Sequence, residues 1–137
     1  MIGVIVVTHG QLANELVNAT TAIVGDLPQF VAVSIGGHDH PTGGREAIKE
    51  AIDRVQGPGG VLILTDMFGG TPSNLGLTFL EANRVEIITG VNLPMLIKLA
   101  HLQQSSSDLL GVAREMREIG RNAIWVASDL LHAEVKT

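Results

Sequence analysis

The residue best suited to chemistry in this sequence is His9, which follows a short apolar run and precedes Gly10. A neutral imidazole has one free lone pair, so it can attack an electrophile such as phosphorus once a partner on the other ring nitrogen fixes the tautomer. Gly10 has no side chain and lets a phosphate or a second chain approach closely. The alternative role for His9 is structural, as a helix cap or a loop hydrogen bond.

Asp66 can supply the partner that a nucleophilic His9 needs. A carboxylate beside an imidazole orients the ring and stabilises positive charge on it as a new bond forms. The alternative role for Asp66 is that of a turn or helix-capping aspartate, and the two roles are about equally favoured by the sequence alone.

The segment 68–74, with the sequence FGGTPSN, has the residue types of an anion-binding loop. Two glycines come before a proline that favours a first helical turn, so exposed backbone amides and a positive helix end are expected there. The alternative is an ordinary tight turn, since the segment is neither a Walker loop nor a dinucleotide fingerprint. The residues expected to contact a phosphoryl group are Gly69, Gly70, Thr71 and Ser73.

A third cluster, His38-Asp39-His40, contains residue types that bind divalent metal ions. Together with His9 and Asp66 it would describe a metal-dependent hydrolase. The favoured interpretation is a solvated loop before a helix, and no metal or other cofactor is predicted.

The composition limits the class of protein. The chain has 137 residues, of which 45% are hydrophobic but only 3% aromatic, so we expect one domain with an aliphatic core. The lack of cysteine excludes disulfides and thiol chemistry, and a net charge of −5 argues against nucleic-acid binding. Residues 1–7 are apolar but too short for a signal peptide or a membrane span. We therefore expect a cytoplasmic protein whose partners do any membrane work.

Strands and helices alternate along the chain. Short β-branched or apolar runs predict strands at 2–8, 30–35, 61–65 and 85–89, and a last strand at Ala123–Ala127. Apolar residues at helical spacing predict helices at 11–24, 45–55, 93–102 and 109–119, and another from about Pro72. Expected helix caps are Thr71, Asn92 and one of the serines 105–107.

This alternation predicts an α/β fold with an open, mostly parallel sheet flanked by helices. Ligands bind such sheets beyond the carboxyl ends of the strands, where the strand order reverses. With strand order 2-1-3-4, His9 and Asp66 follow neighbouring strands at that point. The segment Gly90–Met95 follows the fourth strand at the same edge, where it would line the mouth of the site or form a dimer contact. The alternative is that its apolar residues pack in the core.

Three blocks of sequence together resemble the EIIA domain of the mannose family of the phosphoenolpyruvate:sugar phosphotransferase system (PTS). They are Val6–Gly10 (VVTHG), Leu64–Asn74 (LTDMFGGTPSN) and Gly90–Met95 (GVNLPM), and the resemblance covers almost the whole chain. It implies a single EIIA domain over residues 1–137. The His38-Asp39-His40 loop departs from the family pattern and leaves room for a metal or an altered partner surface.

The resemblance implies a histidine phosphocarrier, a phosphotransferase that needs no metal or nucleotide. His9 would take a phosphoryl group from phosphorylated HPr and pass it to a separate IIB protein, and IIC and IID partners would connect the process to the membrane. Asp66 would hydrogen-bond His9, and Thr71 would lie beside the phosphoryl group. A homodimer is also implied, in which the last strand joins the partner's sheet.

Two alternatives stay open beside sugar transport. One is a regulatory binding module in which the phosphohistidine changes affinity for another protein. The other is the phosphotransfer subunit of a dihydroxyacetone kinase, which shares the fold and the early histidine but lacks the GGTPSN run.

Overall fold

A four-stranded parallel sheet organises the chain, which a computed structural model describes at residues 2–36, 41–102 and 108–135. Its strands are β1 (Gly3–His9), β2 (Phe30–Ile35), β3 (Val61–Thr65) and β4 (Val85–Thr89). Across the sheet they lie in the order β2-β1-β3-β4. The predicted strand order is confirmed. Val7 on β1 pairs with Thr65 on β3, so the carboxyl ends of these two strands are neighbours.

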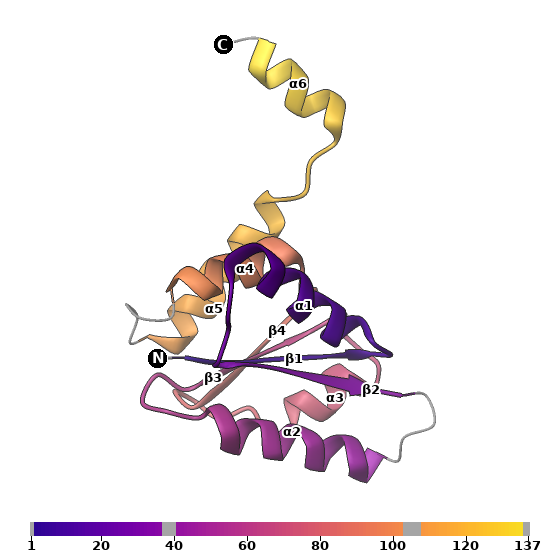
Figure 1. The fold of residues 1–137 in the computed structure, drawn as a ribbon, viewed down its shortest axis with the longest axis vertical. Helices are drawn as coiled ribbons and strands as arrows, with labels where there is room; N and C mark the ends of the chain where they lie inside the picture. Colours follow the sequence, from indigo (N-terminus) through magenta and orange to yellow (C-terminus); the bar gives the residue numbers. More distant parts are fainter. Residues whose placement is uncertain (1, 37–40, 103–107, 136–137) are drawn as a thin grey trace.

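Helices cover both faces of the sheet (Figure 1). One face carries α1 (Leu12–Val24), α4 (Leu93–Leu102) and α5 (Leu109–Asn122). The other carries α2 (Pro41–Val55) and the short α3 (Thr71–Leu77). A sheet covered in this way needs strands that are apolar on both faces, which explains the unbroken β-branched runs in the sequence.

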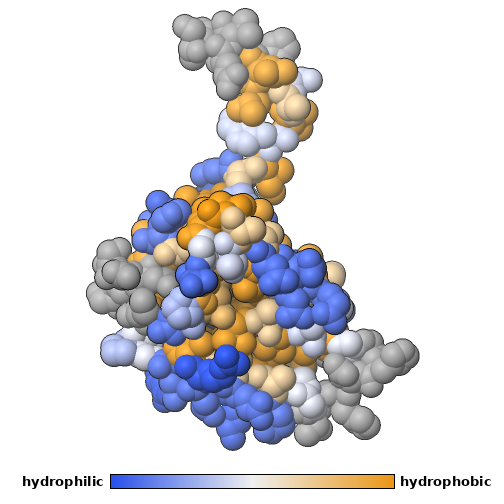
Figure 2. Space-filling model, viewed as in Figure 1, coloured by the Kyte–Doolittle hydropathy of each residue, from blue (hydrophilic) through white to orange (hydrophobic). Residues whose placement is uncertain are grey.

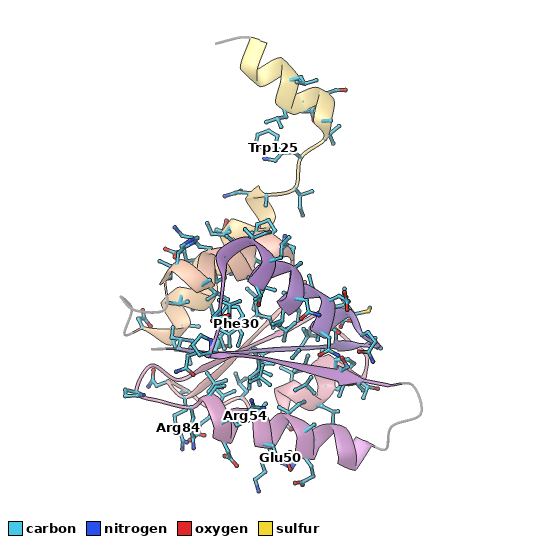
Figure 3. The ribbon with its side chains drawn as sticks, viewed as in Figure 1. Phe30, Glu50, Arg54, Arg84 and Trp125 are labelled. Carbon is cyan, nitrogen blue, oxygen red and sulfur yellow. The ribbon has the colours of Figure 1, made fainter. Side chains whose placement is uncertain are left out.

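Alternate residues of β1 point into two separate cores. Val4 and Val6 pack beneath α1, α4 and α5, whereas Ile5 and Val7 pack against α2. All four side chains are fully buried, and each such burial contributes about 1.5–3 kcal/mol of transfer free energy. Phe30 is the one buried aromatic residue of the described chain, and Figure 3 shows it within the layered body. The expected aliphatic core is confirmed.

Helix α2 begins at Pro41, four residues before the predicted start at Arg45. Two glycines, Gly43 and Gly44, weaken the helical pattern there. Packing explains the glycine at the second of these positions. A Cβ on Gly44 would lie 2.8 Å from a methyl carbon of Leu75, so a glycine is needed where α2 approaches α3.

The predicted helix caps have different outcomes. Asn92 is confirmed, because its side-chain oxygen accepts a hydrogen bond from the N–H of Met95 at 3.2 Å. Thr71 is the first residue of α3 rather than its cap, and the capping position, Gly70, has no side chain to donate or accept. Helix α5 is capped by Asp108, which accepts from the N–H of Gly111, and not by one of the preceding serines. Those serines lie outside the described residues.

The predicted last strand at Ala123–Ala127 is wrong for the single chain. Ala123 is in a turn, residues 124–126 have no regular structure, and α6 (Ala127–Val135) projects away from the body (Figure 1). A strand requires a neighbouring strand to pair its backbone groups. Within the described part of the chain the sheet ends at β4, so this segment has no such neighbour.

Among the described residues, no helix is long and apolar enough to cross a membrane.

Candidate functional site

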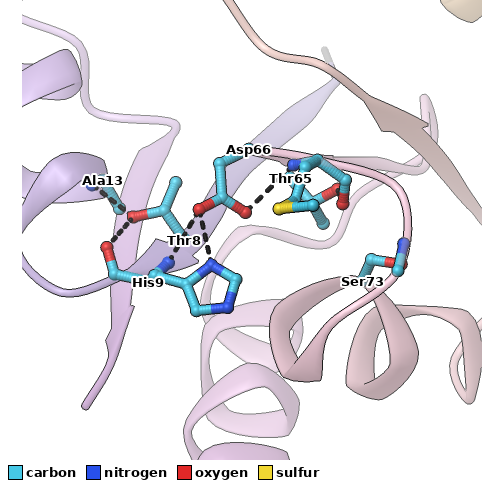
Figure 4. A network of polar contacts seen from close by, with 8 residues as sticks. Thr8, His9, Ala13, Thr65, Asp66 and Ser73 are labelled. Carbon is cyan, nitrogen blue, oxygen red and sulfur yellow. Dashed lines mark hydrogen bonds and ion pairs between the residues drawn. The ribbon is translucent and has the colours of Figure 1, made fainter. Parts of the chain in front are cut away.

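His9 and Asp66 meet at the carboxyl edge of the sheet, where β1 and β3 end side by side. The distance from Nδ1 of His9 to Oδ2 of Asp66 is 2.8 Å (Figure 4). The same carboxylate oxygen accepts the backbone N–H of His9 at 3.0 Å. One oxygen therefore holds both the main chain and the ring of a single residue, which fixes the direction in which the ring points.

The surroundings of Asp66 keep its carboxyl group ionised. Its second oxygen, Oδ1, accepts the N–H of Met67 at 3.0 Å. Partial burial raises the pKa of Asp66, but the hydrogen bonds from the His9 side chain and backbone, together with the His9 charge, outweigh it and bring the pKa below its ordinary value of 3.8. At neutral pH the carboxylate can only accept hydrogen bonds.

An ionised Asp66 determines which nitrogen of a neutral His9 carries the proton. Nδ1 must donate to Oδ2, so the lone pair lies on Nε2. The His9 side chain is 52% exposed, compared with 14% for Asp66. His9 therefore combines a held nitrogen with an accessible one, which is the arrangement that a nucleophilic imidazole requires.

A glycine loop lies against the Nε2 edge of the His9 ring. A Cβ built on Gly70 would be 3.2 Å from Cε1 and 3.3 Å from Nε2. Gly69 and Gly70 have φ angles of +84° and +83°, which favour glycine. The N–H groups of Gly70 and Thr71 have no hydrogen-bond partner within the described chain, so they can bind an anion placed on Nε2.

Ser73 lies inside this loop rather than on its outer side. Its side chain is fully buried, and its hydroxyl oxygen accepts the N–H of Gly69 at 3.1 Å. This contact holds the loop in shape. Thr71, by contrast, is exposed.

Comparison with known proteins identifies the family of this chain. The model of the EIIA-man family, described as PTS system fructose IIA component, matches residues 3–115. The chain belongs to the EIIA-man family. The match includes His9, Asp66 and the whole glycine loop, and members of the family are phosphotransferase components of sugar transport.

Two relatives and one solved structure illustrate the similarity of this EIIA-man chain to known proteins. The PTS fructose-specific EIIA component of Bacillus subtilis (strain 168) is 29% identical over all of this chain and 93% of its own length. The PTS sorbose-specific EIIA component of Lacticaseibacillus casei is 30% identical over 71% of this chain and 70% of its own. The mannose/sorbose-specific IIA subunit from Enterococcus faecalis has a TM-score of 0.80 and 26% identity, covering 90% of this chain and 92% of that one.

The metal hypothesis involves side chains both inside and outside the described part of this EIIA-man chain. No group of three or more histidine, cysteine, aspartate or glutamate side chains comes together there in a way that could hold a metal ion. The His38-Asp39-His40 cluster lies outside the described residues.

Sequence reasoning missed Thr8, the residue before His9. It is fully buried, and its hydroxyl contacts both the His9 carbonyl and the start of α1. A signal for it is present in the sequence, because Gln11 is a poor cap for the helix that begins at Leu12. A polar residue just upstream is then the nearest substitute.

Proposed function

We propose that His9 accepts a phosphoryl group from phosphorylated HPr and passes it to a IIB protein for sugar uptake and phosphorylation. One observation carries the proposal: the 2.8 Å contact between Nδ1 of His9 and Oδ2 of Asp66, which leaves Nε2 free beside the glycine loop. Asp66 is the residue that holds the ring, and Gly69, Gly70 and Thr71 form the surroundings of the phosphoryl group. Ser73 acts on it through Gly69.

In the proposed transfer, one bond to phosphorus forms as another breaks. Nε2 of His9 forms a bond to phosphorus while the bond from phosphorus to the donor's histidine nitrogen breaks, and the donor nitrogen keeps that electron pair. Positive charge develops on the His9 ring, and the carboxylate of Asp66 stabilises it. The phosphoryl oxygens approach the N–H groups of Gly70 and Thr71. Transfer to IIB is the same reaction with His9 as the leaving group.

Apolar side chains near His9 suit contact with protein partners. Leu12, Met67 and Phe68 follow His9 and Asp66 closely in the sequence, and they are 47%, 54% and 75% exposed. Large exposed apolar side chains gathered at a functional edge are typical of protein-binding surfaces. We propose that HPr and IIB both contact this edge, and that IIC and IID partners connect the cytoplasmic carrier to the membrane.

The C-terminal arm supports the further proposal of a homodimer. Ile124, Trp125, Val126 and Leu131 are each more than half exposed, and α6 makes no extensive contact with the other described elements. Figure 2 shows hydrophobic surface on this arm, and Figure 3 shows Trp125 outside the layered body. Burying these side chains against a second copy, whose β4 edge can accept another strand, would remove them from water.

Sedimentation at equilibrium tests the dimer. The protein should give twice the monomer mass, and a deletion of residues 124–137 should give the monomer mass. A monomer at micromolar concentration would contradict the dimer.

Phosphorylation of purified protein tests the carrier function. Incubation with phosphoenolpyruvate, the first enzyme of the PTS and HPr should add one acid-labile phosphate per chain, and His9→Ala should add none. His101→Ala is the matched control, because His101 is also exposed but lies in the last turn of α4. Labelling of His9→Ala at the wild-type level would refute the proposal.

A further inference from the structure

We propose that Thr8 is a positioning residue for phosphoryl acceptance. Its buried hydroxyl fixes the backbone of His9 to the first turn of α1, so that Asp66 can hold both the His9 main chain and the ring. This inference rests on the proposed function of His9, and it assigns to Thr8 a part in that function.

The Thr8 hydroxyl acts both as a hydrogen-bond acceptor and as a donor. It accepts the N–H of Ala13, the second residue of α1, at 2.6 Å, and it donates to the carbonyl oxygen of His9 at 3.0 Å (Figure 4). The side chain is completely buried, so water cannot replace either hydrogen bond. Serine can make the same two bonds, whereas valine has nearly the same shape and can make neither.

Few other hydrogen bonds hold the connection between β1 and α1, so this connection depends on the Thr8 hydroxyl. Only Gly10 and Gln11 separate His9 from the start of α1, and Gln11 makes no side-chain capping bond. Gly10 has a φ of +53° and donates its N–H to the carbonyl of Ile35 at 3.0 Å. Thr8 thus performs the capping that Gln11 does not, and the same hydroxyl also holds the carbonyl of His9.

The position of the His9 backbone matters because one carboxylate oxygen serves two donors of this residue. Oδ2 of Asp66 lies 3.0 Å from the His9 backbone nitrogen and 2.8 Å from Nδ1. Hydrogen bonds weaken steeply when distance or angle changes, so both bonds persist only over a narrow range of backbone positions. With the His9 N–H held by Asp66 and its C=O held by Thr8, the ring has one direction available, with Nε2 beside Gly70.

A matched control separates positioning from helix stability. Thr20 is also fully buried in this region, and its hydroxyl donates to the carbonyl of Leu16 at 2.8 Å near the other end of α1. Thr8→Val and Thr20→Val therefore each remove a buried threonine hydroxyl that contacts α1. Only the first removes a contact to His9.

Single-turnover transfer from phosphorylated HPr, measured over a range of HPr concentrations, tests the proposal. Thr8→Val should slow the saturated rate by roughly 10- to 100-fold with little change in the half-saturating HPr concentration. Thr8→Ser should recover the rate to within about threefold of wild type, since the bond energies are retained. Thr20→Val should transfer at the wild-type rate, even if urea unfolding shows that it is equally destabilised. If Thr8→Val does not fold, Thr8→Ala gives the same comparison.

Two outcomes would overturn the proposal: a wild-type rate in folded Thr8→Val, or an equal loss of rate in Thr20→Val. A second measurement does not depend on phosphorylation. Nitrogen NMR of the unphosphorylated His9 ring should show a protonated, hydrogen-bonded Nδ1 in wild type and Thr20→Val, and exchange between tautomers in Thr8→Val. If wild-type protein accepts no phosphate, the proposed function fails, and the NMR comparison still decides whether Thr8 positions the ring.

Discussion

Replacing Asp66 with asparagine removes the negative charge and one acceptor oxygen while keeping the size of the side chain. In the native site Oδ2 accepts two hydrogen bonds from His9 and Oδ1 accepts one from Met67. The amide of asparagine has only one oxygen, so one side must face an N–H₂ group. If the oxygen faces His9, the N–H₂ opposes the N–H of Met67. If it faces Met67, the N–H₂ favours the tautomer with the proton on Nε2, which cannot attack phosphorus.

The size of the effect follows from the charge that develops on His9. A carboxylate and an imidazolium about 4 Å apart attract by about 4 kcal/mol at an effective dielectric constant of about 20. His9 is 52% exposed, so solvent screening reduces this by roughly half, to about 2 kcal/mol. A weakened hydrogen bond to a charged acceptor costs about 1.5–3 kcal/mol. Part of that cost is the same electrostatic attraction already counted above, so the total loss is about 2–4 kcal/mol. The rate of phosphoryl acceptance should therefore fall by about 30- to 1,000-fold.

Quenched-flow measurement of transfer from phosphorylated HPr provides the assay, with acid-labile phosphate on the chain as the readout. Asp53→Asn is the control, because it removes the same charge from an exposed position on α2. We expect Asp53→Asn to transfer at the wild-type rate. A rate for Asp66→Asn within about threefold of wild type would refute the reasoning, because it would mean that Asp66 contributes less than about 0.7 kcal/mol to the transition state.

Three further predictions concern the same edge of the sheet. The NMR signal of the Asp66 carboxyl carbon should titrate with a midpoint below 3.8, so Asp66 stabilises the fold above pH 3.8 and loses this effect as the pH falls through its folded-state pKa. In His9→Ala this midpoint should rise, because the hydrogen bonds and charge of His9 no longer oppose the effect of burial, and an unchanged midpoint would count against this account. Gly70→Ala should abolish phosphorylation by placing a methyl group 3.3 Å from Nε2. Gly90 has a similar φ of +79° but open space around the added carbon, so Gly90→Ala should lower the free energy of unfolding in urea by about 1–2 kcal/mol and keep its activity; equal activity of the two variants would contradict the steric argument. Phe68→Ala should slow labelling by phosphorylated HPr but not by a small phosphoramidate donor, and a parallel loss with both donors would show that Phe68 acts on the site rather than on the partner.

The sequence was informative about the fold where its signal was local. Three strands, at 30–35, 61–65 and 85–89, have the predicted limits, because strands buried on both faces need an unbroken run of apolar side chains. The meeting of His9 with Asp66 was also predictable, because any sheet of order 2-1-3-4 brings the ends of its first and third strands together.

The sequence was less informative where an element depends on what lies beside it. Gly43 and Gly44 argue locally against a helix, yet α2 includes both of them, and at Gly44 the contact with α3 leaves no room for a side chain. Ala123–Ala127 has the composition of a strand, but composition cannot supply the neighbour that a strand needs.

By itself, then, the sequence determined the order of the elements as far as α5, the buried faces and the edge at which His9 and Asp66 meet, because each of these follows from periodicity and parallel topology. Only the tertiary structure decided the finer geometry of the site. It brought Oδ2 of Asp66 to two hydrogen-bond donors of His9, 57 positions away in the sequence, and placed Gly70 against Nε2. It also turned Ser73 inward and gave the Thr8 hydroxyl its two partners. Such contacts depend on strand register and loop conformation to within a fraction of an ångström, and residue patterns carry no information at that scale.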